Sequence, residues 1–276
     1  MGNKKARDSG KDQLFAVSKD QCKERIHFLK IPIDIIEPEN LIFLLHQFLA
    51  EEKEKNIVLL SVWDILRARQ NPEYRAYLQK AALVIPISKS IIKGIRFLQG
   101  KQAVRYMPFE FVISILSILE NQEFSCYLIG GKKPILSKAE KNIRETFSGL
   151  RVVGRFSGSF KRQEETVILE AIRKASPSLL LVGKGIRGGE YWIARNSDRL
   201  GKGLRLWCSD LFEVFAERKK HPSKGVFTLG LEWVGYCFQN PFKLLRFFPF
   251  MYYKMLLLGY KIFRTGGSHK TKPIQK

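Results

Sequence analysis

The sequence predicts an α/β fold in which helices cover both faces of a mostly parallel sheet. Short β-branched or leucine-rich runs alternate along the chain with segments of helical apolar spacing, which is typical of a parallel sheet buried on both faces. The chain has 276 residues, of which 45% are hydrophobic and 20 are phenylalanines. This apolar content suffices for the core of one domain and excludes a wholly disordered basic protein.

The predicted strands are short apolar runs. They cover residues 28–35, 56–61, 81–86, 125–130, 150–154, 178–183 and 204–208. The predicted helices lie between the strands and cover residues 40–54, 64–80, about 137–147, about 164–175 and about 190–196. A last helix begins at Asp210, because Glu213 follows three residues later as in a capping box.

Charge and cysteine content limit the class of protein. The chain carries 48 lysines and arginines against 26 acidic residues, a formal net charge of +22. Its four cysteines are scattered with no pair at zinc-ligand spacing, so we expect neither a metal nor another cofactor. No secretory signal occupies residues 1–19, which indicates a cytoplasmic protein. No helix-turn-helix, zinc-finger or RNP motif accompanies the charge, so nucleic acid is not an expected partner.

Composition divides the chain into four predicted parts. A charged lead-in covers residues 1–25, and the α/β domain covers residues 26–232. From Trp233 onward the sequence contains no Asp or Glu, so residues 233–265 are predicted to form a separate basic amphipathic helical appendage. Residues 266–276 are predicted to be a disordered basic tail.

The appendage has the pattern of a helix that lies on a membrane surface. At about 100° per residue its cations fall within an arc of roughly 80° and leave a broad apolar face. The predicted membrane-binding residues are Lys243, Arg246, Lys254, Lys261 and Arg264. A span over residues 244–263 would place Lys254 at mid-bilayer, at a cost of roughly 2.5 to 3.5 kcal/mol, so we favour peripheral attachment to the anionic inner face of the cell membrane. Packing of this helix on the protein core or on a partner subunit remains an alternative.

The ends of the predicted strands carry the candidate ligand-binding residues, because ligands of such sheets bind outside the carboxyl ends of the strands. Gly183, Gly185 and Gly188 follow one strand with the spacing of a phosphate-binding turn, and Arg187 lies inside it. The same spacing, with Asp210 downstream, also fits a dinucleotide fingerprint or a plain tight turn. Trp63 follows another strand and either stacks on a ring of the ligand or belongs to the core.

Four stretches, in the same order, resemble the bacterial glycosyltransferase family named for WecG, TagA and CpsF. They are LIGGKKP (Leu128–Pro134), GLRVVGRFSGSF (Gly149–Phe160), LLLVGKGIRGGEYWI (Leu179–Ile193) and LGLEWVGYCFQNPFKLLRF (Leu229–Phe247), within a similarity over about residues 28–247. The resemblance implies a Rossmann-like fold of the GT-E type. It also implies transfer, without a required metal, of an N-acetylmannosamine-type sugar from a UDP-sugar to a polyprenyl-diphosphate-linked acceptor in cell-envelope polysaccharide synthesis.

The resemblance also places functional residues. The predicted substrate-binding residues are Ser61, Arg105, Gly183, Gly185, Arg187 and Glu190. At the position of the family's favoured general base this chain has Ile87, which cannot accept a proton. The predicted substitutes for the base are Asp64, Glu190 and Asp210, although each could instead only cap or complement a helix start.

This difference leaves two functions open. The first is a transferase with a diverged active site, and the alternative is a catalytically inactive pseudoenzyme that serves as a binding or scaffold subunit of an envelope glycan complex. Assembly into a homo-oligomer also remains open.

Overall fold

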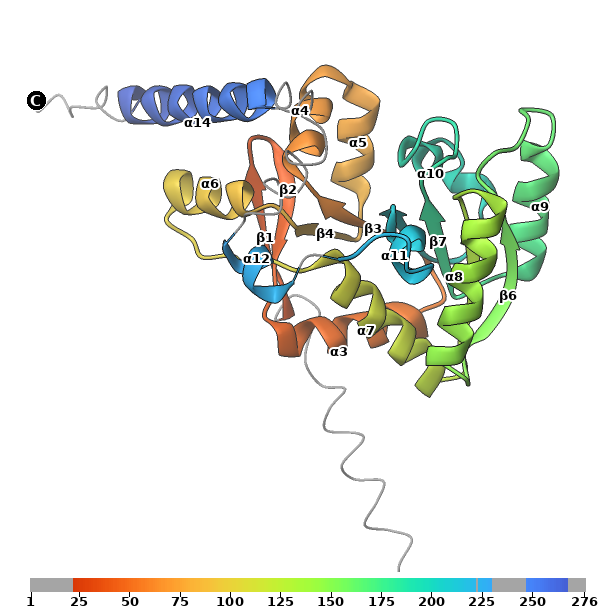
Figure 1. The fold of residues 1–276 in the computed structure, drawn as a ribbon. Helices are drawn as coiled ribbons and strands as arrows, with labels where there is room; N and C mark the ends of the chain where they lie inside the picture. Colours follow the sequence, from red (N-terminus) through yellow and green to blue (C-terminus); the bar gives the residue numbers. More distant parts are fainter. Residues whose placement is uncertain (1–21, 222, 230–246, 268–276) are drawn as a thin grey trace, which may run out of the picture.

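A six-stranded parallel sheet forms the centre of the fold (Figure 1), which confirms the predicted α/β class. The computed structural model describes residues 22–221, 223–229 and 247–267. The order across the sheet is β4-β3-β8-β7-β5-β6. The strands are β3 (Glu54–Leu60), β4 (Leu83–Pro86), β5 (Ser125–Ile129), β6 (Arg151–Phe156), β7 (Leu179–Gly183) and β8 (Gly203–Ser209). Apart from their ends, these are six of the seven runs that the sequence predicts as strands, and β6, at the edge of the sheet, is mostly exposed.

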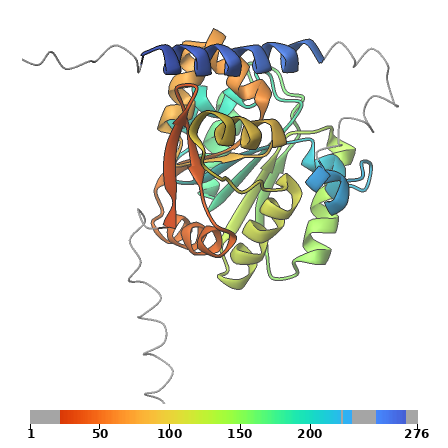
Figure 2. The ribbon, with the colours of Figure 1, turned by 90° about the vertical axis from the view of Figure 1, so that its left-hand side faces the viewer.

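Helices cover both faces of the sheet, and two separate cores result (Figures 1 and 2). One face is covered by α4 (Val62–Gln70), α5 (Pro72–Lys80), α6 (Lys89–Gln99), α9 (Glu165–Ala175) and α10 (Tyr191–Arg195). The other is covered by α3 (Pro38–Ala50), α7 (Pro108–Asn121), α8 (Lys133–Thr146) and α11 (Leu211–Phe215). In β7, Leu180 and Val182 enter the first core and Leu179 and Leu181 the second, because successive side chains of a strand point to opposite faces.

A β-hairpin replaces the single extended segment predicted over residues 28–35. Strands β1 (Glu24–Phe28) and β2 (Ile31–Ile35) pair antiparallel around Leu29 and Lys30, which both have positive φ angles. The buried Asp34 holds this hairpin to the sheet: it accepts two hydrogen bonds of 2.7 Å from Arg25 and one of 2.8 Å from the backbone of Val84 in β4. The carboxylate is thereby paired with a cation and accepts hydrogen bonds on both oxygens, as burial requires.

The helix predicted over residues 64–80 is two helices. Asn71 separates α4 from α5, and its side chain accepts a hydrogen bond of 2.9 Å from the backbone of Tyr74. Pro72 opens α5, where its missing N–H costs nothing. Helices α6 and α7 lie in the stretch between β4 and β5, for which the sequence analysis predicts no element.

The described part of the predicted appendage is one helix, α14 (Phe247–Gly267), which lies beside α4 and α6 (Figures 1 and 2). Tyr253 and Leu257 on this helix are buried in the first core. The Tyr253 hydroxyl donates a hydrogen bond of 3.2 Å to the Ser90 carbonyl. Among the described residues, no helix is both long and apolar enough to cross a bilayer. Lys243 and Arg246 lie outside the described residues, and the side chain of Arg264 is not described either.

Candidate active site

A cleft of about 860 Å³ opens at the carboxyl ends of β3, β4 and β8. Strand β4 lies on one side of β3 and strand β8, from much later in the sequence, lies on the other. The connections that leave these strand ends therefore diverge and leave a crevice, which is where open α/β sheets bind their ligands. A cleft of this size accommodates a nucleotide or a sugar.

The wall above β3 is a hydrogen-bonded cluster around Asp64. The Asp64 Oδ2 atom accepts bonds of 2.7 Å from the backbone N–H of Ser61 and 2.6 Å from its hydroxyl, while Oδ1 accepts a bond of 3.0 Å from the buried Tyr74 hydroxyl. Ser61 precedes α4 and Asp64 lies in its first turn, so the capping pattern of the helix itself brings these groups together. Both line the cleft. Three donors hold the Asp64 carboxylate in one orientation.

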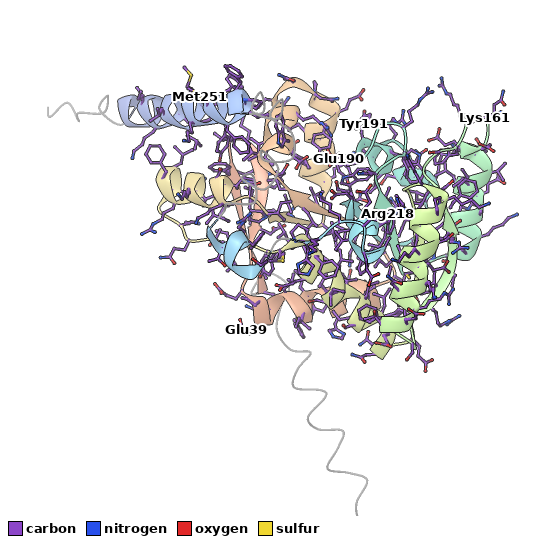
Figure 3. The ribbon with its side chains drawn as sticks, viewed as in Figure 1. Glu39, Lys161, Glu190, Tyr191, Arg218 and Met251 are labelled. Carbon is purple, nitrogen blue, oxygen red and sulfur yellow. The ribbon has the colours of Figure 1, made fainter. Side chains whose placement is uncertain are left out.

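Glu190, labelled in Figure 3, directly precedes α10 and lines the same cleft as this cluster. Its carboxylate is paired with Arg67 of α4, and its side chain is only 17% exposed. Burial raises the pKa of Glu190 well above the ordinary range of a carboxyl; the charge of Asp64 raises it further, and Arg67 offsets part of the rise. A carboxyl in this environment can hold or accept a proton near neutral pH.

The third carboxyl of the cleft, Asp210, follows β8 and is paired with Lys219. Its side chain is 32% exposed against 17% for Glu190, so the Asp210 carboxylate itself keeps more contact with water than the Glu190 carboxylate does. Ile87 follows β4 and also lines the cleft. The three carboxyls that the sequence predicts as proton acceptors therefore share one cleft with the isoleucine they are predicted to replace.

Arg105 and Lys89 connect the cleft to the short helix α12 (Lys224–Leu229). The Arg105 Nε atom donates a bond of 2.7 Å to the carbonyl of Ile87, and its Nη1 atom donates to the carbonyl of Phe227. Lys89 donates a bond of 2.9 Å to the carbonyl of Thr228. These cations meet the carbonyl end of α12, where the helix dipole is negative.

Charge and apolar surface meet in this cleft. Five lysine and arginine side chains line it against the three carboxyls, namely Arg67, Lys89, Arg105, Lys219 and Lys220. Aromatic rings line it as well, namely Trp63, Phe109, Trp207, Phe227 and Phe250. An excess of cations fits a diphosphate, and rings fit a base, a sugar or an apolar chain.

The comparisons with known proteins decide the family. The sequence model of the glycosyl transferase WecG/TagA/CpsF family matches residues 26–269. The chain belongs to this family. It is also 21% identical, over 212 residues, to a curated N-acetylglucosaminyldiphosphoundecaprenol N-acetyl-beta-D-mannosaminyltransferase of Bacillus spizizenii. That match covers 76% of this chain and 82% of the relative.

In this member of the family, the predicted phosphate-binding turn lies only partly at the cleft. Gly188 and Gly189 line the cleft, with φ angles of 90° and 57° that favour glycine. Gly183 and Gly185 do not line it: a Cβ atom on Gly183 would lie 2.4 Å from the Phe212 ring, so the absence of a side chain there serves packing. Arg187 is exposed and is not among the lining residues.

The structure adds cleft residues that the sequence alone did not single out. They are Arg67, Lys89, Phe109, Trp207, Lys219, Lys220, His221 and Phe227. Arg67 could have been found, because it lies three residues after Asp64 on the same helix and hence on the same face. The rings of Phe109 and His221 stack at 4.8 Å between centroids although they are far apart in the sequence, and only the tertiary structure brings them together.

Proposed function

We propose that this glycosyltransferase moves an N-acetylmannosamine-type sugar from a UDP-sugar to a polyprenyl-diphosphate-linked acceptor in envelope polysaccharide synthesis. The observation that carries the proposal is the cleft at the carboxyl ends of β3, β4 and β8, with its excess of cations and its carboxyl of raised pKa. The name of the Bacillus relative supports the sugar and the acceptor.

Donor binding is assigned to the cationic side of the cleft. Arg105 and Lys89 donate hydrogen bonds to carbonyls of α12. In the complex, the oxygens of a diphosphate would accept these bonds in place of the carbonyls. Such charge-assisted bonds stabilise the negative charge that develops on the leaving UDP. Among the described residues no three His, Cys, Asp or Glu side chains gather as metal ligands, and transfer without a metal stays a prediction.

Glu190 is the proposed proton acceptor. In the transfer, an acceptor hydroxyl forms a bond to the anomeric carbon, the bond from that carbon to UDP breaks, and the hydroxyl proton moves to the Glu190 carboxylate. A base whose pKa lies close to the working pH is suited to this step. Asp64 is assigned a positioning role, because Ser61 and Tyr74 already occupy its oxygens. Asp210, after β8, is paired with Lys219.

The proposed location is the inner surface of the cell membrane. The face of α14 opposite Tyr253 carries an exposed apolar stripe, made of Phe248, Met251, Tyr252, Met255, Leu258 and Ile262. At about 100° per residue these side chains fall within an arc of about 120°. Lys254 and Lys261 are also exposed, where they can meet anionic lipid. Figure 3 marks the stripe with Met251, on the helix that lies along the edge of the molecule.

The decisive experiment incubates the full-length protein with a panel of UDP-sugars and polyprenyl-diphosphate-linked sugar acceptors in vesicles. Release of UDP together with formation of a disaccharide lipid is the expected result. The matched variant Glu190→Gln should bind UDP normally and lose turnover. Tight UDP binding by the wild type with no turnover across the panel would instead support the inactive scaffold, for which Ile87 at the base position is the motivating feature.

A further inference from the structure

The C-terminal helix contributes one side chain, Phe250, to the lining of the cleft. Phe250, in the first turn of α14, packs against Trp63, in the first turn of α4, with ring centroids 6.4 Å apart and ring planes at 79°. Both rings line the cleft. The C-terminal helix therefore contributes directly to the candidate active site, and the contact joins two segments that are far apart in the sequence.

This ring pair joins the cleft to the exposed stripe. The sequence from Phe247 to Tyr253 is FFPFMYY, so the first charged residue of this part of the helix is Lys254, one turn after Phe250. Phe248, Met251 and Tyr252 are exposed next to Phe250, and Trp63 is 40% exposed. Apolar side chains therefore extend from a surface suited to lipid into the cleft. On α4, Arg67 lies one turn beyond Trp63 and begins the charged part of the same cleft.

The order of these groups matches an amphiphile that has an apolar chain attached to a diphosphate. We propose that Trp63 and Phe250 bind the isoprene units next to the diphosphate of the acceptor, so that the lipid enters the cleft without leaving the membrane surface. Edge-to-face rings provide flat apolar walls for such a branched chain. The two rings are then specificity-determining residues for the acceptor lipid. This inference rests on the proposed function and adds to it the route of the acceptor.

Photo-crosslinking tests the site without requiring turnover. The full-length protein is mixed with vesicles that contain a polyprenyl diphosphate with a diazirine on its first isoprene unit, and labelled peptides are mapped by mass spectrometry. We expect the label in the segments around Trp63 and Phe250, and competition by unlabelled polyprenyl diphosphate. Equal competition by an ordinary phospholipid would overturn the assignment to an isoprenoid, as would a label confined to the stripe.

Kinetics with two acceptors provides the second measurement. Trp63→Ala and Phe250→Ala should raise the KM for a long-chain acceptor about tenfold and change the KM for a short-chain, water-soluble acceptor less than about threefold. Val167→Ala is the control, because Val167 on α9 is 67% exposed and belongs neither to the cleft nor to the exposed stripe of α14. Equal losses with both acceptors would contradict the inference.

The two measurements separate failure of this inference from failure of the proposed function. If no sugar is transferred but the label still appears at the ring pair, the lipid site stands and the transferase proposal fails. If transfer is observed and the label lies elsewhere, the transferase stands and the route past Trp63 and Phe250 is wrong.

Discussion

The hydroxyl of Tyr253 on α14 lies 2.6 Å from the point that a Cβ atom on Gly94 of α6 would occupy. The same added atom would lie 2.8 Å from Phe28 and 3.3 Å from Leu257. The absence of a side chain at Gly94 thus leaves a notch in the surface of α6, and the C-terminal helix packs into this notch. Since Phe250 is on that helix, this notch also fixes one side chain of the cleft lining.

Gly94→Val should therefore loosen α14 from the body. A valine side chain cannot share the space that Tyr253 and Phe28 fill, so the helix must shift. Hydrogen exchange should become faster at the amides of residues 253–257, and the KM for a long-chain acceptor should rise as in Phe250→Ala. Gly259→Ala is the control, because nothing lies within 4 Å of its added atom. Unchanged exchange in Gly94→Val would refute the notch.

The stripe of α14 should govern vesicle binding. Changing both Phe248 and Met255 to serine removes two side chains that are 68% and 67% exposed, and should reduce flotation with anionic vesicles at least tenfold. Lys254→Gln should weaken binding to anionic vesicles by about fivefold, or about 1 kcal/mol, and leave binding to neutral vesicles unchanged.

Val167→Ser on α9 is the matched control, since Val167 is equally exposed, at 67%, on a different helix. If the stripe variant floats as well as the wild type, the attachment proposal is wrong.

Glu190 should make folding stability depend on pH. Because its pKa is raised in the folded protein, the carboxyl binds its proton more tightly there than in the unfolded chain. The folded protein therefore loses stability as pH rises from the ordinary carboxyl pKa through the raised one. Glu190→Gln removes this loss, so its melting temperature should exceed that of the wild type increasingly from pH 5 to pH 9 and match it near pH 4.

Although Glu190→Gln should be more stable than the wild type at neutral pH, its kcat should fall by about a hundredfold or more. Glu217→Gln provides the control for both measurements, since Glu217 is 73% exposed, is paired with Lys138 and does not line the cleft. If the melting temperatures of Glu190→Gln and the wild type differ by the same amount at every pH, Glu190 is not the carboxyl that titrates.

Arg105 and Arg187 should differ in their effect on UDP binding, although the sequence nominates both. Arg105 lines the cleft, with its guanidinium carbon 3.6 Å from the centre of the Phe227 ring, whereas Arg187 does not line the cleft. Arg105→Ala should weaken UDP binding about tenfold or more in calorimetry. Arg187→Ala should change it less than about twofold. Equal losses of UDP affinity in the two variants would show that Arg187 and the glycine turn also belong to the donor site.

The sequence by itself determined the α/β class and the strands of the sheet. Central strands such as β7 are buried on both faces, and the all-apolar run Leu179–Val182 fits only such an environment, so local composition suffices to predict it. The capping pattern that joins Ser61 to Asp64 is likewise local, because it spans one helical turn. The hairpin turn at Leu29 and Lys30 carries no glycine or asparagine, and the sequence therefore gave no sign of it.

Only the tertiary structure decided which strand ends share a cleft. Glu190 and Arg67 meet across 123 positions because β7, which leads to Glu190, is separated from β3 by β8 alone, an order of strands that no local pattern encodes. The same holds for α14: its sequence shows one broad apolar face, but packing against α6 divides that face into a buried side with Tyr253 and an exposed side with Met255. Burial is a property of the neighbours a residue acquires, and those neighbours come from distant parts of the chain.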